Sequence, residues 1–371
     1  MSNATALDLP PPIKGVLVVG AVAMIIVTMG GNAMVCLAVL LVRTLKQPPN
    51  FLLVSLAVAD FFVGCFVMPI ALLDALTNEW PLGHAGCLLW TTADFALCTA
   101  SIVNLCAISV DRYLVISRPL RYSAQRTTKR VMLYILTVWI IAAIVAISSI
   151  FFAPTWDHES KSHTCQVNNT VGYQIYATVV AFYFPTAVMV IVYAKIWSAA
   201  KRLAKQDRMI GVDSFHITKT IPDRIPAPDK RTSSTSQGSE GKDERRLLHR
   251  PSTILHSIKA MKTLGVMMGI YIICWLPFFV YAIVKTIIEP QPGALDTILL
   301  WLGYSNSMLN PMIYCKYNKE FRVPFREMLC CRFRTLQNVM RHEEFNNKFG
   351  EPKRRTESIA TNGNCECPID M

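Results

Sequence analysis

Seven long stretches of the chain contain no charged residue or only one. A helix that crosses the hydrocarbon core of a bilayer needs about 20 predominantly apolar residues, and each stretch supplies roughly that number or more. Seven such stretches in series are not typical of soluble domains. The pattern predicts an all-α membrane protein, a seven-transmembrane helix bundle spanning residues 15–315, with helices in the ranges 15–42, 51–73, 87–110, 131–156, 166–194, 263–284 and 297–315.

A short segment after the seventh stretch has a different pattern. Its large apolar residues recur at the spacing of one helix face, as Phe321, Phe325 and Leu329. This predicts a short amphipathic helix on the inner leaflet, within residues 316–331. The adjacent Cys330 and Cys331 are candidate palmitoylation sites, with free cytosolic thiols as the alternative.

Two segments are too polar to form a core of their own. The segment from about residue 200 to 252 is rich in Lys, Arg, Ser and Asp and nearly lacks aromatic residues, and the tail 332–371 is similar. Such a composition cannot bury enough apolar surface to fold alone. We therefore predict a disordered cytoplasmic loop and a disordered cytoplasmic tail.

Charge supports a membrane protein and gives its orientation. The 371 residues are 52% hydrophobic and 17% charged, and 37 Lys and Arg against 25 Asp and Glu give a net charge of +12. Basic residues concentrate in alternate loops, and the positive-inside rule assigns those loops to the cytoplasm. The N-terminal segment 1–14 is then extracellular, in a multi-pass plasma-membrane protein. We expect part of the basic excess to contact membrane lipid, and no nucleic-acid partner is expected.

The predicted outer side carries two further signals. Asn3 and Asn168 each lie in an Asn-x-Thr glycosylation sequon, and both sequons fall on outer segments. Of the 12 cysteines, only Cys87 and Cys165 lie at the outer, oxidising side. We predict a disulfide between these two, which would hold the loop after the fourth helix over the mouth of the bundle.

Ionisable residues inside membrane helices are unfavourable and mark functional positions. Asp60 and Asp94 lie within apolar stretches, and Arg112 lies at the inner end of the third helix. Asp94 and Arg112 are 18 residues apart, which is five helical turns, so they share one face of one helix. Asp94 could bind a cationic ligand. The alternative is an internal pair with Lys or Arg, but no basic residue lies at that depth in the helices.

Aromatic residues on the sixth helix suit the same ligand. Trp275, Phe278 and Phe279 have the spacing i, i+3 and i+4, so they form one patch beside Pro277, which can kink the helix. An aromatic face and a carboxylate together favour a protonated amine. On periodicity alone, the same residues could instead face lipid or the core.

Short motifs in all seven stretches resemble those of the rhodopsin-like (class A) G protein-coupled receptors. They occur in the family's order, each in the corresponding helix, as Gly30-Gly31-Asn32, Leu56-Ala57-Val58-Ala59-Asp60, Cys87, Asp111-Arg112-Tyr113, Trp139, Pro185, Tyr193, Cys274-Trp275-Leu276-Pro277 and Asn310-Pro311-Met312-Ile313-Tyr314.

Within that family the chain resembles the biogenic amine receptors, and most of all the serotonin receptors. The resemblance implies an amine site at Asp94, Phe95, Cys98, Thr178, Ala181, Trp275, Phe278, Phe279 and Tyr304. Catechol-binding members carry serines on the fifth helix, where this chain has Ala177, Thr178 and Ala181. Octopamine, tyramine and other trace amines remain alternatives to serotonin.

The resemblance also implies a mechanism. An allosteric sodium ion, and no other cofactor, would bind at Asp60, Ser101, Asn306, Ser307 and Asn310. The expected activation residues are Asp111, Arg112, Tyr113, Tyr193, Pro277, Asn310, Pro311 and Tyr314. They would couple the amine to outward movement of the sixth helix and to a heterotrimeric G protein, with arrestin and receptor kinases as further partners.

Two positions depart from the family pattern. Ser257 stands where many relatives carry an acidic residue that holds the arginine corresponding to Arg112, and Tyr271 replaces a phenylalanine. We therefore expect appreciable basal activity.

Two other classes of function fit the sequence poorly. An amine or proton-coupled transporter would use Asp60 and Asp94 as a relay, but carriers show paired halves or broken helices. An enzyme is not expected, because the sequence has no paired catalytic groups, no Walker loop and no zinc-ligand spacing.

Overall fold

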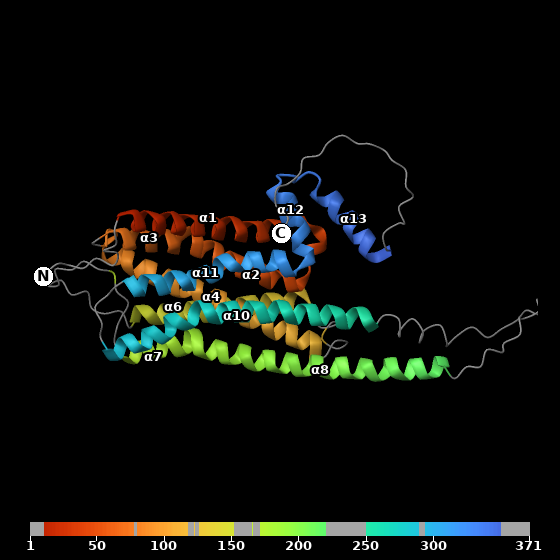
Figure 1. Cartoon of the computed structure of the whole chain (residues 1–371). Helices are drawn as coiled ribbons and strands as arrows, with labels where there is room; N and C mark the ends of the chain where they lie inside the picture. The colour runs from red at the N-terminus through yellow and green to blue at the C-terminus, as the bar shows by residue number, and fades with distance from the viewer. Residues whose placement is uncertain are drawn as a thin grey trace, which may run out of the picture.

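The computed structural model describes residues 11–77, 80–117, 122, 126–151, 165, 171–219, 250–288 and 294–349. Within these ranges the chain is a bundle of long helices without a strand (Figure 1). In chain order the elements are α1 (Pro11–Leu41), η1 (Arg43–Leu45), α2 (Pro48–Phe62), η2 (Val63–Val67), α3 (Met68–Leu76), α4 (Gly83–Ser117), α6 (Thr128–Phe151), α7 (Val171–Thr178), η3 (Val179–Tyr183), α8 (Phe184–Lys219), α10 (Arg250–Ile288), α11 (Ala294–Tyr317), α12 (Lys319–Leu329) and α13 (Leu336–Phe349).

The predicted seven-helix bundle is confirmed. Six helical spans in the described residues are long and apolar enough to cross a membrane, and they coincide with the first six predicted ranges. The seventh range lies in α11, whose 24 residues rise roughly 36 Å. It is less apolar because it contributes several buried polar side chains, but it packs within the bundle against α1, α2 and α10.

Two of the spans contain a widened π-helical turn, and each such turn immediately precedes a proline. The π-helix η2 ends just before Met68-Pro69, and η3 ends just before Phe184-Pro185. Proline lacks an N–H and its ring clashes with the carbonyl four residues earlier, so an α-helical turn is strained there. A π turn relieves this clash and changes the direction in which the following side chains point.

The proline in α11 has its missing hydrogen bond replaced by another helix. Pro311 cannot donate to the carbonyl of Ser307, and the Asn32 side chain of α1 donates to that oxygen instead, at 3.0 Å. Gly31 permits this approach, since a Cβ there would lie 3.1 Å from Pro311. The Gly30-Gly31-Asn32 motif therefore packs α1 against α11 at Pro311.

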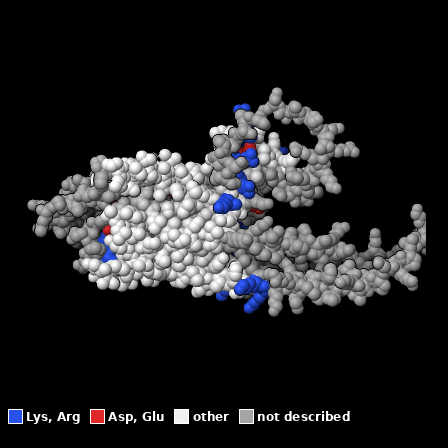
Figure 2. All heavy atoms as spheres, viewed as in Figure 1, with Lys and Arg blue, Asp and Glu red and all other residues white. Residues whose placement is uncertain are grey.

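The outer surface of the bundle suits a hydrocarbon environment. Large apolar side chains such as Val16, Leu133 and Ile144 are exposed on the outer faces of their helices. In the view of Figure 2 the middle of the bundle shows no described charged residue, and charges gather at its two ends. We call these the disulfide end, which holds Cys87, and the α12 end.

The predicted amphipathic helix is α12, and it packs on α1 and α11. Phe321 and Phe325 are buried as predicted, whereas Leu329 is 48% exposed and Met328 is buried in its place. In the last turn of α12 the buried residue therefore lies one position earlier in the sequence than the predicted apolar stripe. Palmitoylation stays a prediction: Cys331 is a free, exposed thiol.

The structure is more helical than predicted in the polar segments. α8 continues to Lys219 and α10 begins at Arg250, so the predicted disordered loop at about 200–252 is helical at both ends. α13 likewise lies within the predicted disordered tail. These segments contain Lys, Arg, Ala, Leu and Gln, which have high helix propensity. The central part of that loop and the sequons at Asn3 and Asn168 lie outside the described residues.

Candidate functional site

One long helix carries most of the candidate residues. α4 is continuous for 35 residues and packs against α2, α6, α8 and α10. It positions Asp94 near the disulfide end, Ser101 at mid-depth, and Asp111 and Arg112 near the α12 end. The predicted common helix for Asp94 and Arg112 is therefore confirmed, and the site consists of three layers along it.

The first layer is built around Asp94, which is half-buried. The Tyr304 hydroxyl of α11 donates to one carboxylate oxygen at 3.1 Å, and the Cys98 thiol donates to the other at 3.2 Å. Both donors are neutral. Within the described ranges, no Lys or Arg forms an ion pair with Asp94. The carboxylate is therefore held by hydrogen bonds while its charge is left without a cation.

The aromatic patch of α10 lies beside this carboxylate. Trp275 and Phe279 are buried, and the Trp275 ring meets the Tyr304 ring edge-on with centroids 6.5 Å apart. Phe278 packs edge-on against Trp275 at 5.9 Å. The patch therefore belongs to the interior of the bundle, and of the alternatives left open by periodicity the lipid-facing one is wrong.

A close helix approach fixes the tryptophan. A Cβ at Gly303 of α11 would lie 2.6 Å from the Trp275 ring, so only glycine leaves room for it.

The other predicted ligand residues lie on α4 and α7–η3. Thr178 and Ala181 are buried at the start of the π turn η3. Phe95 is half-buried and its ring meets that of Tyr173 on α7 at 6.5 Å. Thr178 makes no hydrogen bond with another described residue. The predicted disulfide between Cys87 and Cys165 is present, and it ties the start of α4 to the segment before α7.

The second layer surrounds Asp60 of α2, which is fully buried. Its Oδ1 accepts hydrogen bonds from the hydroxyls of Ser101 at 2.8 Å and Ser307 at 2.9 Å. Its Oδ2 accepts one from the Asn310 amide at 2.7 Å. Three helices, α2, α4 and α11, thus meet at one carboxylate.

This layer has the chemistry of a site for a small hard cation. The Asn306 side-chain oxygen is buried and has no hydrogen-bond partner among the described residues. The Asp60 carboxylate and the two serine hydroxyls are oxygen donors, which hard cations prefer, and Asn306 is the neighbour of Ser307 on α11. A cation would neutralise the buried charge that the three neutral donors leave in place.

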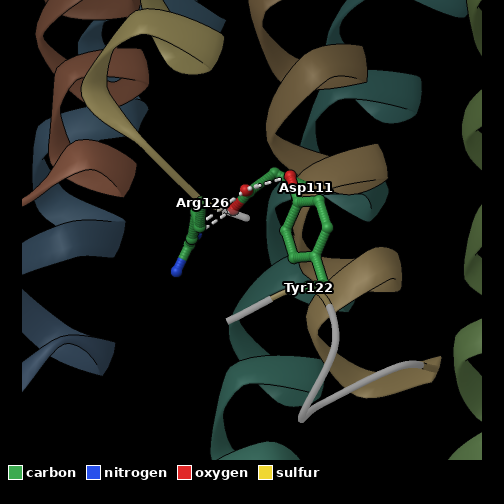
Figure 3. Close-up of polar contacts among 3 residues, drawn as sticks. All are labelled: Asp111, Tyr122 and Arg126. Atoms are coloured by element: carbon green, nitrogen blue, oxygen red, sulfur yellow. Dashed lines mark hydrogen bonds and ion pairs between the residues drawn. The ribbon is translucent and has the colours of Figure 1, made fainter. Parts of the chain in front are cut away.

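The third layer surrounds Asp111, whose exposed fraction is only 1%. Arg126 binds both carboxylate oxygens of Asp111: its Nε lies 3.0 Å from Oδ1, and its Nη2 pairs with Oδ2. The Tyr122 hydroxyl also donates to Oδ1, at 3.1 Å (Figure 3). Arg130 lies over the Tyr122 ring, 5.3 Å from its centroid. Burial, and next the negative charge of Asp111, raise the pKa of the Tyr122 phenol, so it stays a neutral donor. We call Asp111, Tyr122 and Arg126 the Asp111 cluster.

Beside the Asp111 cluster, Arg112 is half-buried and has no hydrogen-bond or ion-pair partner among the described residues. Ser257 lies on α10, but its side chain is outside the described set. The Asp111 oxygens accept hydrogen bonds from Arg126 and Tyr122, and none from Arg112 is found among the described residues.

The remaining activation residues line the same end. The Tyr193 hydroxyl lies against α10 at Gly265, where a Cβ would be 2.6 Å from it. Tyr314 is buried, with its ring 6.3 Å from Phe321 of α12, and its hydroxyl has no partner among the described residues. Tyr113 is half-buried.

The sequence pattern did not identify several contacts that shape these layers. Tyr122 and Arg126 lie in a connection without periodicity, where basic residues indicated only orientation. The hydrogen bond between the Asn32 side chain and the Ser307 carbonyl depends on the path of α1 beside α11. A helix-breaking Pro311 four residues after Ser307 is the one signal that could have indicated a free carbonyl there.

Comparison with known proteins gives consistent matches. A family model described as 7 transmembrane receptor (rhodopsin family) matches residues 31–314. The chain is 35% identical to 5-hydroxytryptamine receptor 7 of Xenopus laevis, over 88% of this chain and 81% of that receptor. It is 36% identical to probable G-protein coupled receptor No18 of Amphibalanus amphitrite, over 83% and 88%.

A further relative is longer than this chain. The chain is 34% identical to 5-hydroxytryptamine receptor 1 of Drosophila melanogaster over 84% of its own length, and the match spans 63% of that receptor.

We predict that Arg126→Met lowers the melting temperature of the detergent-solubilised protein, because Asp111 would keep a buried charge without its cation. Such a loss costs about 3–5 kcal/mol. Adding Asp111→Asn to Arg126→Met should recover part of the melting temperature by removing the unpaired charge. Lys129→Met is the matched control, since Lys129 is exposed on the same segment. An equal, small change for Arg126→Met and Lys129→Met would contradict the role of the cluster.

Proposed function

The chain belongs to the rhodopsin family of seven-transmembrane receptors, and on this basis we propose that it binds a protonated biogenic amine at Asp94 and activates a heterotrimeric G protein. The observation that carries the proposal is the Asp94 carboxylate itself. It is oriented by two neutral donors and lacks an ionic partner among the described residues. An amine would supply the missing positive charge.

The surroundings of Asp94 support a cation with an aromatic body. Buried carboxylates are stabilised only when they are paired and hydrogen-bonded. The Trp275 and Phe278 rings add cation–π attraction, about 0.5–2 kcal/mol for a well-placed cation. The Tyr304 hydroxyl holds the carboxylate towards these rings.

Serotonin is the amine that the fifth span supports best. Thr178 offers one buried hydroxyl that has no hydrogen-bond partner among the described residues, and Ala181 offers none. One hydroxyl suits the single polar group of an indoleamine better than the paired hydroxyls of a catechol. Two of the similar proteins are named as 5-hydroxytryptamine receptors. Octopamine, tyramine and other trace amines are the competing ligands.

The proposed receptor lies in the plasma membrane with the disulfide end outside. A disulfide persists in an oxidising compartment, and the α12 end carries most of the described basic residues (Figure 2). The α12 end then faces the cytoplasm, where rearrangement of Arg112, Tyr193 and Tyr314, which are half-buried or buried in the structure, would admit a G protein. Arrestin and receptor kinases would use the same face.

Sodium and agonist would act on this bundle in opposite directions. The oxygen set around Asp60 joins α2, α4 and α11, and sodium bound there would neutralise Asp60 and hold these helices together. The amine binds α4 and α11 through Asp94 and Tyr304. A ligand shifts the equilibrium between the resting and the active bundle only by binding one of them more tightly. Since sodium would favour the resting bundle and the amine the active one, each would lower the affinity of the receptor for the other.

We predict that Asp94→Asn reduces the potency of the amine agonist by about 100-fold or more, which corresponds to about 2.7 kcal/mol. The asparagine keeps the shape of the side chain and removes the charge that pairs with the amine. A panel of serotonin, octopamine, tyramine and dopamine is measured by cAMP and calcium responses, with surface expression quantified in parallel.

Asp74→Asn is the control for Asp94→Asn, because it removes a half-buried carboxylate from α3 near the same end. It should leave the potency within about threefold, which is about 0.7 kcal/mol. Full potency in Asp94→Asn would show that the agonist does not pair with Asp94. Uptake of labelled amine without G-protein turnover would identify a carrier instead.

We predict that sodium lowers agonist affinity by at least about fivefold, at the low end of allosteric couplings. The measurement is agonist displacement on membranes with sodium replaced by N-methylglucamine at constant ionic strength. Asp60→Asn should abolish the dependence, since it removes the only formal charge in the oxygen set. Ser55→Ala should preserve it, because Ser55 binds Trp139 outside that set. A sodium effect that survives in Asp60→Asn would exclude this site.

We predict measurable second-messenger production without ligand, because Arg112 has no partner among the described residues. Ser257→Glu should lower this basal signal by giving Arg112 an acidic neighbour on α10, and Ser257→Ala is the control that adds no charge. Equal, near-zero signals in the three proteins would contradict the prediction.

A further inference from the structure

An ion pair joins α10 and α11 at the disulfide end, where α10 ends and α11 begins (Figure 1). The Lys285 Nζ lies 2.5 Å from Oδ1 of Asp296, and the Tyr281 hydroxyl donates to Oδ2 of the same carboxylate at 3.4 Å. The side chains of Lys285 and Asp296 are 24% and 30% exposed. Because the pair is partly buried, dissolved ions screen it less than a pair on the open surface.

Helical spacing places this ion pair above the proposed amine site. Phe278, Tyr281 and Lys285 have the spacing i, i+3 and i+7, so they lie on one face of α10. Asp296 precedes Tyr304 by eight residues, which is also the spacing of one helix face. The pair therefore lies about two helical turns, or roughly 10–12 Å, beyond Phe278 and Tyr304. An amine that approaches Asp94 from the disulfide end passes this level.

The outer segment of α10 is joined to the rest of the helix through a weak point. Pro277 has no N–H to donate to the carbonyl of Ile273, so the helix lacks one backbone bond there. A helix bends most readily at such a proline. Beyond it, the apolar side chains of Val280, Val284 and Ile287 are exposed on the outer face. The segment after Pro277 is therefore a short lever, whose position depends on its contacts with neighbouring helices.

Closer to the α12 end, α10 and α11 are held together by other contacts. The Trp275 ring lies so close to Gly303 that a Cβ there would be 2.6 Å from it. The Cys274 thiol lies 3.4 Å from the Ser305 hydroxyl. These contacts fix the two helices at the floor of the proposed site. The ion pair fixes them at its mouth.

We propose that the Lys285–Asp296 ion pair is a latch across the mouth of the amine site and sets the rates at which the amine enters and leaves. The proposal rests on the proposed function. When the pair separates, the outer segment of α10 hinges at Pro277 away from α11. The latch is closed both before and after binding, so it changes the barrier to exchange and leaves the affinity nearly unchanged. Lys285 and Asp296 are positioning residues that touch no bound amine.

The first test measures access to the site without any amine. The Cys98 thiol is half-buried and donates to Asp94, so it reports on the floor of the site. Methyl methanethiosulfonate is a small neutral reagent that transfers its methylthio group to a thiolate as a mixed disulfide and releases methanesulfinate. Its rate of reaction at Cys98 is followed by mass spectrometry of the Cys98 peptide from full-length receptor in membranes.

Lys285→Met and Asp296→Asn should each raise the rate of Cys98 modification at least about threefold, which is within the range expected for loss of one partly exposed ion pair. Lys14→Met and Asp74→Asn are the matched controls, since each removes one half-buried charge near the same end. Both controls should keep the rate of the wild type. A neutral reagent is not attracted or repelled by the charges that these variants remove.

The second test measures exchange of tritiated serotonin on the same membranes. Lys285→Met and Asp296→Asn should raise the association and dissociation rates by similar factors, at least about threefold, and leave Kd within about twofold. A purely electrostatic role predicts a different result. Loss of the lysine would then speed association and loss of the aspartate would slow it, and this opposite pattern would overturn the latch.

Two double variants separate a specific pair from general loosening of the mouth. Lys285→Met with Asp296→Asn should match the single variants, because either change alone already opens the latch. Lys285→Asp with Asp296→Lys rebuilds the pair with its charges exchanged. This variant should return both the Cys98 reaction and the serotonin exchange rates towards those of the wild type.

The outcomes distinguish the latch from the proposed function. If serotonin binds the wild type but both single variants keep its rates, if their effects add, or if the exchanged pair reacts as fast as the single variants, the latch is overturned. If no amine binds the wild type while Cys98 reacts faster in both single variants and the exchanged pair reverses this, the latch is supported and the amine proposal fails.

Discussion

The buried carboxylate of Asp60 is the constraint on which the bundle depends. A charge in a medium of low dielectric constant is tolerated only with donors on every side. Asp60 takes these donors from α4 and α11, so neither helix can shift without exposing it. The same helices carry Asp94 and Tyr304 towards the disulfide end. The hydrogen bonds that satisfy Asp60 thus fix α4 and α11 relative to each other, and this sets the distance between Asp94 and Tyr304.

Helix-breaking residues provide the second set of constraints. A proline within a span removes a backbone donor, and the structure compensates in one of two ways at Pro69, Pro185 and Pro311. The Asn32 side chain supplies the donor that Pro311 lacks, and π turns precede Pro69 and Pro185. The polar side chains of the interior therefore repair the backbone as well as build sites.

Periodicity predicted the seven spans and the amphipathic helix, and the cost of buried charge marked Asp60 and Asp94, because both are local properties of the sequence. The residues that converge on the two carboxylates were implied by the resemblance to the receptor family. The sequence did not predict the partners of Asp111. Tyr122 and Arg126 reach that carboxylate through a connection whose path depends on tertiary packing. Leu329 was assigned to the wrong face because the end of α12 deviates by one residue from a simple stripe. The polar composition of the segment at about 200–252 predicted disorder, whereas both of its ends are helical. The prediction did not take into account the high helix propensity of the Lys, Arg, Ala and Leu residues at these ends.

The π turn η3 has a consequence for how the fifth span varies. One extra residue in a helical turn rotates everything after it by about 100° relative to an unbroken α-helix. Thr178 and Tyr193, on opposite sides of η3, therefore follow different helical phases. A helical wheel drawn through the whole span assigns one half to the wrong side. The span behaves as two modules, so the half that carries Thr178 can diversify without altering the orientation of the half that carries Tyr193.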